Sequence, residues 1–248
     1  MAGQADAACA PSGATALLAG AISYALGACV QVTPGEMALP TPCADWDLEA
    51  LLGHLAGSMA DLESAIRTGH LDLDPSEPQR PKYPQSPQRP QGSQRPEGSQ
   101  RPEGFQRPED PQRPEDLGGS VRPAAPGRPA APGLDGGDPV ETLRDQAANL
   151  LFACYAHHGP DRFVLVGGLP LPAGIVACTG AVEIAVHGWD VRAARGRGDP
   201  IPPALATRML RLSPLLVTGR EGLFGTPVQV PAQASPGDQL VAYLGRHP

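Results

Sequence analysis

The stretch AVEIAVHGWD, residues 181–190, combines an apolar helical pattern with two ionisable side chains. Nearly every position around Glu183 and His187 is apolar, which predicts a helix that is buried on most sides. These two residues are four apart, so a helix places them on one face, with Cβ atoms about 6 Å apart. A buried carboxylate is costly unless it is paired or binds a metal ion. The stretch therefore predicts a buried helix carrying either a hydrogen-bonded Glu–His pair or two ligands of one cation.

A second histidine lies in an equally apolar setting. His54 stands in ALLGHLAG, residues 50–57, among leucines at helical spacing. A lone histidine in such a place is more often a core residue than a ligand. Combined with Glu183 and His187, however, it supplies a third protein ligand for one divalent ion, with zinc as the first choice. Three protein ligands leave a coordination position open, which is typical of catalytic rather than structural zinc sites.

Two neighbouring residues keep alternatives open. Asp190 could accept a hydrogen bond from a ligand imidazole, or pair with Arg192 or Arg195 on the helix surface. Cys43 could approach the same centre, but a buried structural thiol is the simpler interpretation.

Most of the remaining sequence has helical periodicity. Asp45 or Asp47 can cap the second helix, Asp138 is suited to cap the third, and Pro139 suits a first helical position. The predicted helices cover residues 15–32, 47–68, 138–158, 173–194, 203–217 and 238–244. Residues 163–166 are β-branched and apolar, residues 167–172 read as a turn, and residues 224–231 look extended. The pattern predicts an all-α fold, an up-and-down four-helix bundle with a short C-terminal extension.

A low-complexity block interrupts this pattern. The hexamer SQRPEG begins at Ser93 and again at Ser99, and related hexamers follow from Phe105 and Pro111. Such a sequence has too little apolar surface to offset the entropy of ordering, which predicts a disordered, Pro-rich insert. The expected organisation is bundle helices in 13–75, the insert in 76–133, further helices in 134–218 and an extension in 219–248.

Composition narrows the choice of partners and location. The net charge is −7, and the chain lacks the basic surface that nucleic-acid binding requires. No apolar run is long enough to cross a membrane, and the first residues lack the basic region of a signal peptide. The five cysteines form no CxxC pair, which favours reduced thiols in a cytoplasmic protein.

Two blocks resemble a known family. LPTPCADWDLEALLGHL, from Leu39, and VEIAVHGWDVRAARG, from Val182, resemble the mycothiol-dependent maleylpyruvate isomerase N-terminal family of the DinB-like superfamily. The final 25 residues, from Phe224, look like the ending of an actinobacterial branch without the full C-terminal domain of the isomerases. The resemblance implies a four-helix bundle that binds zinc or a similar divalent ion through His54, Glu183 and His187.

The resemblance also implies a reaction. In this family the metal is thought to activate the thiol of mycothiol, which predicts a thiol transferase or isomerase acting on a small-molecule thiol and an electrophilic substrate. Maleylpyruvate isomerisation itself is not predicted, because the isomerases use residues of the further C-terminal domain. Two alternatives remain: a non-catalytic metal-binding or sensor protein, and an interaction scaffold built on the Pro-rich repeat. The sequence also leaves a homodimer open.

Overall fold

The structure is a computed structural model that describes residues 11–43, 46–71, 138–157, 159, 161–217 and 224–248. The chain divides into two compact units, residues 1–85 with 130–248, and residues 86–129. All the described residues belong to the first unit. The predicted insert, residues 76–133, lies outside the described residues.

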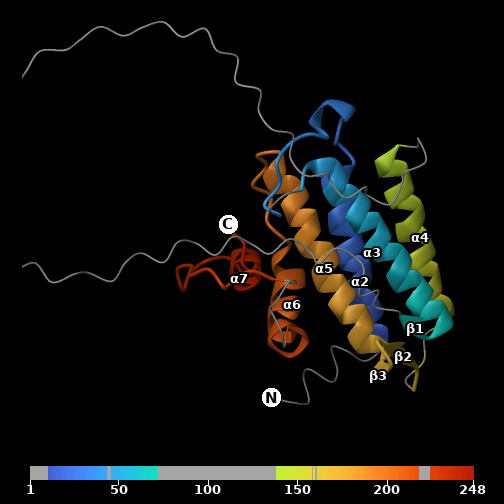
Figure 1. Ribbon diagram of the computed structural model, residues 1–248. Coiled ribbons are helices and arrows are strands. Elements are labelled where there is room, and N and C mark those ends of the chain that lie inside the picture. Colours follow the sequence, from blue (N-terminus) through green and yellow to red (C-terminus); the bar gives the residue numbers. More distant parts are fainter. Residues whose placement is uncertain (1–10, 44–45, 72–137, 158, 160, 218–223) are drawn as a thin grey trace, which may run out of the picture. The chain divides into compact units, whose positions relative to one another are not determined.

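Four helices form a bundle, and the predicted DinB-like helical fold is confirmed. They are α2 (Pro11–Cys29), α3 (Leu48–Thr68), α4 (Pro139–Ala156) and α5 (Ala173–Ala194). Helix α5 packs on α2 and α3, and α3 also packs on α4 (Figure 1). Helices α2 and α5 run in one direction, whereas α3 and α4 run in the other (Figure 1). The alternating direction predicted for an up-and-down bundle therefore holds from α2 to α3 and from α4 to α5, but not from α3 to α4.

The helix starts follow from the predicted caps. Asp47 accepts a hydrogen bond from the Ala50 amide at 2.9 Å, and Asp138 accepts one from the Val140 amide at 2.9 Å. Both side chains satisfy amides that the first helical turn leaves without a partner. Helix α2 ends at Cys29 rather than Val32, and a short 3-10 turn, η1 (Pro34–Glu36), follows it.

A small sheet closes one end of the bundle. Strand β1 (His70–Leu71) pairs in parallel with β2 (Phe163–Val166), which pairs antiparallel with β3 (Leu169–Pro172). The prediction of a turn over 167–172 was wrong for its last four residues. The turn is made by Gly167 and Gly168 alone, both at positive φ, and the LPLP segment then returns as an edge strand. An edge strand tolerates proline because no further strand needs its amide groups.

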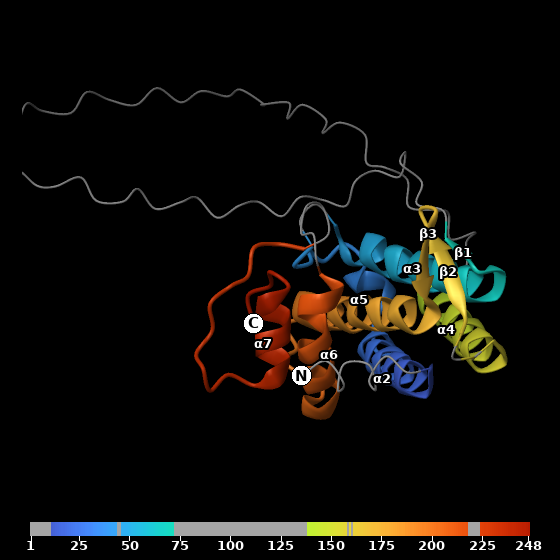
Figure 2. The ribbon, with the colours of Figure 1, turned by 90° about the horizontal axis from the view of Figure 1, so that it is seen from below.

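The C-terminal part packs beside the bundle. Helices α6 (Pro203–Leu216) and α7 (Pro236–Tyr243) pack against each other, and α6 also contacts α5 and α2 (Figure 2). Both helices were predicted, with slightly different ends. After α7 the backbone turns at Gly245, which has a φ of 88°. A Cβ atom there would lie 2.5 Å from the Cα of Gly225, so the turn requires glycine.

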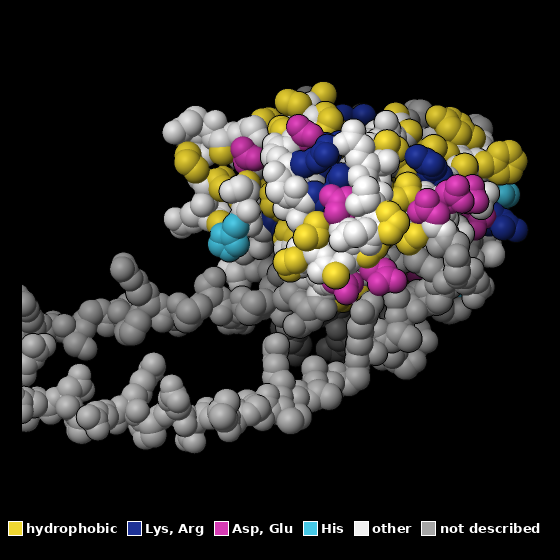
Figure 3. Space-filling view, turned by 90° about the horizontal axis from the view of Figure 1, so that it is seen from above, with side chains coloured by type: hydrophobic (Ala, Val, Ile, Leu, Met, Phe, Trp, Pro, Cys, Tyr) yellow, Lys and Arg dark blue, Asp and Glu magenta, His cyan; other side chains and the backbone are white. Residues whose placement is uncertain are grey.

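Ion pairs lie at the end of the bundle opposite the small sheet. Figure 3 shows acidic and basic side chains next to one another at this end. Arg195, at the end of α5, donates to Glu36 at 2.9 Å, and Arg192 donates to Asp199 at 2.6 Å. The first pair connects the segment after α2 with the end of α5, and the second connects α5 with the segment that follows it. None of the helices in the described part of the chain is long and apolar enough to span a membrane.

Candidate metal centre

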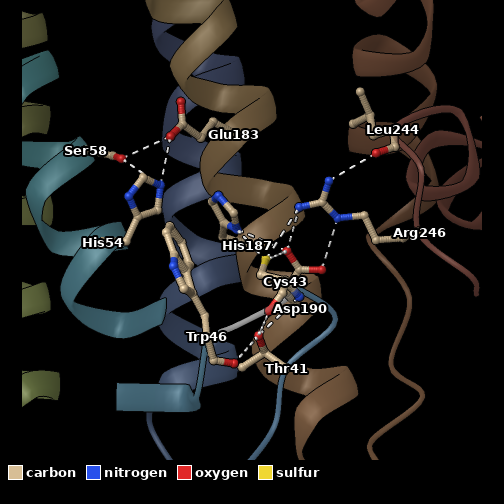
Figure 4. Close-up of polar contacts among 10 residues, drawn as sticks. All are labelled: Thr41, Cys43, Trp46, His54, Ser58, Glu183, His187, Asp190, Leu244 and Arg246. Atoms are coloured by element: carbon tan, nitrogen blue, oxygen red, sulfur yellow. Dashed lines mark hydrogen bonds and ion pairs between the residues drawn. The ribbon is translucent and has the colours of Figure 1, made fainter. Parts of the chain in front are cut away.

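Three predicted residues converge between α3 and α5. His54 projects from α3, while Glu183 and His187 project from successive turns of α5 (Figure 4). One ligand atom from each lies within 4.8 Å of the others. The side chains of His54 and Glu183 are each 17% exposed, so the group can be reached from solvent on one side.

One separation within this group equals that of two ligands of a metal ion. His54 Nε2 lies 3.3 Å from Glu183 Oε1. A tetrahedral zinc ion with ligand distances of about 2.0–2.1 Å separates neighbouring ligand atoms by about 3.3 Å. Two imidazoles and one carboxylate are also ligands that zinc accepts. The chemistry and the spacing of the donors are therefore compatible with one divalent ion.

Ser58 joins this group, although the sequence analysis did not identify it. It lies one helical turn after His54, and its hydroxyl donates to Glu183 Oε1 at 3.0 Å. The hydroxyl oxygen of Ser58 also lies 3.3 Å from His54 Nε2 (Figure 4). The spacing of four between His54 and Ser58 was the available signal, because it places both on one helix face.

Asp190 orients the buried ligand candidate. Its Oδ2 lies 3.0 Å from Nδ1 of His187, the first of the two alternatives considered for this residue. Arg192 and Arg195 pair elsewhere, with Asp199 and Glu36. When His187 Nδ1 donates to Asp190, the lone pair of Nε2 is available, and Figure 4 shows this nitrogen directed toward Glu183 and His54.

Electrostatics favour a neutral imidazole beside an ionised carboxylate. Burial lowers the pKa of His187, although hydrogen bonding to Asp190 acts in the opposite direction. Burial alone would raise the pKa of Asp190, but the charge of Arg246 and the hydrogen bond from His187 hold it well below its usual value. Neutral imidazole is the form that binds metals.

Arg246 is the residue that sequence reasoning missed most completely. Its Nη2 and Nε donate to the two carboxylate oxygens of Asp190 at 2.9 and 3.2 Å. Both residues are almost fully buried. The two residues are 56 positions apart, and no periodicity or motif in the sequence connects them.

Cys43 lies on the same side of His187 as Asp190. Its Sγ is 3.2 Å from Asp190 Oδ2 and 3.8 Å from His187 Nδ1. Cys43 is thus buried, as predicted, and also adjacent to the candidate centre. Two other cysteines are unsuited to act as thiolates, because burial raises the pKa of Cys29 to about 12 and that of Cys154 to about 11.

Trp46 also borders the centre. Its ring centroid is 4.6 Å from that of His54 and 6.4 Å from that of His187. Thr41 holds both Trp46 and Cys43 in place, since its hydroxyl donates to the Trp46 carbonyl and accepts from the Cys43 amide. Trp46 therefore lies next to the donor atoms rather than only in the core.

The fold and the site together define a helical bundle of the DinB-like class with a candidate His–Glu–His metal centre. The pattern of the mycothiol maleylpyruvate isomerase N-terminal domain matches residues 18–192, which include all three candidate ligands. The chain belongs to this family of metal-binding, mycothiol-related proteins.

The names of two similar proteins do not assign an activity to them. Uncharacterized proteins from two strains of Mycobacterium tuberculosis are each 31% identical to this chain over 113 residues. The match covers 40% of this chain and 60% of each relative, so the chain spans less than two thirds of the length of these relatives. No solved structure matches the chain significantly.

Proposed function

We propose that this protein holds one divalent metal ion, most simply zinc, at His54, Glu183 and His187, and uses it to activate a small-molecule thiol of the mycothiol type. The observation that carries the proposal is the convergence of these three donors within 4.8 Å of one another, with His54 and Glu183 only 3.3 Å apart. Membership of a mycothiol-related family supports the choice of thiol. The reaction proposed is transfer of the thiol to an electrophilic substrate, or an isomerisation that proceeds through such an adduct.

The residues have distinct roles in this proposal. His54, Glu183 and His187 hold the ion and leave one coordination position for a thiol. A metal-bound thiol is deprotonated at neutral pH, which supplies the nucleophile. Asp190 keeps His187 in the tautomer that binds through Nε2. The partly exposed edge of His54 and Glu183 gives the thiol a route from solvent.

Calorimetric titration tests both parts of the proposal. The first titration adds Zn²⁺ to the metal-free protein, and the second adds mycothiol to the zinc-loaded protein. We expect one ion per chain in the wild type and in His70→Ala, an exposed histidine on β1, and loss of binding in His54→Ala and Glu183→Ala. Unchanged metal stoichiometry in the latter two variants would remove the proposed site.

The thiol titration separates catalysis from simple metal binding. Heat of mycothiol binding that depends on zinc supports the activated-thiol function. Zinc binding without thiol binding would instead assign a metal-binding or sensor role. In either case the ion should raise the free energy of unfolding by about 2.7 kcal/mol when its free concentration is about 100 times Kd.

A further inference from the structure

His187 belongs to two groups of potential metal ligands among the described residues. One is His54, Glu183 and His187, and the other is Cys43, His187 and Asp190. In the second group, Asp190 Oδ2 is 3.0 Å from His187 Nδ1 and 3.2 Å from Cys43 Sγ. Thiolate, imidazole and carboxylate are all ligands of zinc. Residue chemistry alone therefore does not decide which side of the imidazole faces a metal.

The positively charged side chain of Arg246 lies against the second group. The guanidinium of Arg246 donates to both oxygens of Asp190, and its Nη2 is also 3.8 Å from Cys43 Sγ. Arg246 is only 3% exposed, and an arginine stays protonated in proteins. A metal ion on this side would meet the guanidinium and compete with it for the carboxylate.

We propose that Arg246 is a positioning residue of the metal centre. Its guanidinium takes the place of a second cation, closes the side of His187 that faces Cys43 and Asp190, and anchors Asp190. Through Asp190 it holds the His187 ring with Nε2 facing Glu183 and His54 (Figure 4). This inference rests on the proposed binding of metal at His54, Glu183 and His187.

Hydrogen bonds within the C-terminal segment fix the position of Arg246. The turn at Gly245 follows α7 directly, and Arg246 Nη1 donates to the Leu244 carbonyl at 3.1 Å. The backbone amide of Arg246 donates to the Val241 carbonyl at 2.9 Å. The residues that match the family end at 192, so this contribution comes from outside the matched region.

Cobalt binding followed by absorption spectroscopy tests the role of Arg246. The probe is Co²⁺ added to metal-free full-length protein. We expect the wild type to bind one Co²⁺ without a thiolate-to-cobalt charge-transfer band. In Arg246→Met, Co²⁺ can take the place of the guanidinium beside Asp190 and bind the sulfur of Cys43, whose proton passes to solvent, so that the band appears. Adding Cys43→Ser to Arg246→Met should abolish the band.

Two further variants distinguish positioning from a purely structural role. Arg246→Lys keeps the charge but cannot contact both Asp190 oxygens in the same way, so we expect no band and about 10-fold weaker Co²⁺ affinity. Arg67→Met, which removes an exposed arginine of α3, should match the wild type. A structural role alone would lower the Tm of Arg246→Lys without changing its Co²⁺ affinity.

The outcomes separate this inference from the proposed function. A folded Arg246→Met variant with the spectrum and affinity of the wild type would overturn the role of Arg246 and leave the metal centre intact. Failure of the wild type to bind Co²⁺ would contradict the metal centre itself. If Arg246→Met does not fold, Arg246→Lys decides: reduced affinity at unchanged Tm supports the inference, and unchanged affinity overturns it.

Discussion

The two nitrogens of His187 face different environments. Nδ1 lies against the buried Asp190 carboxylate, whereas Nε2 is directed toward the partly exposed Glu183 and His54. Burial lowers the pKa of His187, which keeps the ring neutral at neutral pH. In a neutral imidazole, the nitrogen that donates a hydrogen bond carries the proton, so only the other nitrogen can bind a metal ion. The direction of the ring thus fixes the side on which a metal can bind.

Ser58 should contribute to metal affinity without being a ligand. Its hydroxyl donates to Glu183 Oε1, so Ser58→Ala leaves that carboxylate less firmly oriented. We expect about 10-fold weaker Zn²⁺ binding by competition with a chelating dye. Ser64→Ala, at an exposed position of the same helix, provides the control. Equal affinities for the two variants would mean that Ser58 does not orient Glu183.

The ion pair between Glu36 and Arg195 should make stability depend on acid pH. Hydrogen bonds from Arg195 and from the Thr33 amide lower the pKa of Glu36 from 4.5 to about 2. A lowered folded-state pKa stabilises the protein above the unfolded value, and this contribution is lost as pH falls from about 4.5 to about 2.

Glu36→Gln should therefore have a Tm a few degrees lower at pH 7, the limit expected for an exposed pair. The difference should shrink as the pH is lowered through that window, as measured by circular dichroism. A difference that persists unchanged at pH 2 would assign the effect to packing rather than to charge.

Helix α5 carries the candidate centre and is the element that the sequence predicted best. Its bounds match the predicted range of 173–194, because a long apolar run followed by a glycine gives clear start and stop signals. The three candidate ligands could be found for the same reason, since each lies in a regular helical pattern. Strand β3 was missed, because its proline-rich sequence lacks strand propensity and only pairing with β2 makes it a strand.

The second half of the site could not be predicted from the sequence. Arg246 meets Asp190 only after α6 and α7 have packed beside the bundle. Neither residue has a pattern that identifies the other, because the contact depends on how elements distant in sequence are arranged. Local periodicity thus identified the candidate ligands, whereas the side chains that orient them required tertiary structure.

Close packing of α5 on α2 should make Gly188 intolerant of a larger residue. A Cβ atom at this position would lie 2.8 Å from the Ala25 Cα and 3.1 Å from its Cβ. Because a backbone atom cannot move aside as a side chain can, we expect Gly188→Ala to cost about 1–3 kcal/mol. Thermal or urea unfolding provides the measurement.

Gly57→Ala is the matched control in α3, where an added Cβ meets nothing within 4 Å. Alanine is a better helix former than glycine, so this variant should gain about 0.5–1 kcal/mol. Destabilisation of both variants by the same amount would contradict the role of close packing at Gly188.

At the scale of the whole molecule, the direction of α3 and α4 sets a length for the connection between them. Both helices run the same way, so the end of α3 and the start of α4 lie toward opposite ends of the bundle (Figure 1). The 18 residues of α4 extend about 27 Å. We propose that residues 76–133 are an insert in this connection, between bundle residues 13–75 and 134–218, with 219–248 as the extension.

Shortening the connection tests this organisation. Direct deletion of 76–133 leaves residues 72–75 and 134–137, whose full reach is roughly 30 Å, so the connection would be taut. With about twelve Gly and Ser residues in place of the insert, the connection has a root-mean-square span of about 25 Å. We expect this linker variant to keep the Tm and Zn²⁺ affinity of the full chain, and the direct deletion to lower the Tm. Loss of Zn²⁺ binding in the linker variant would show that the insert contributes to the centre, whereas equal Tm values for both variants would contradict the crossing connection.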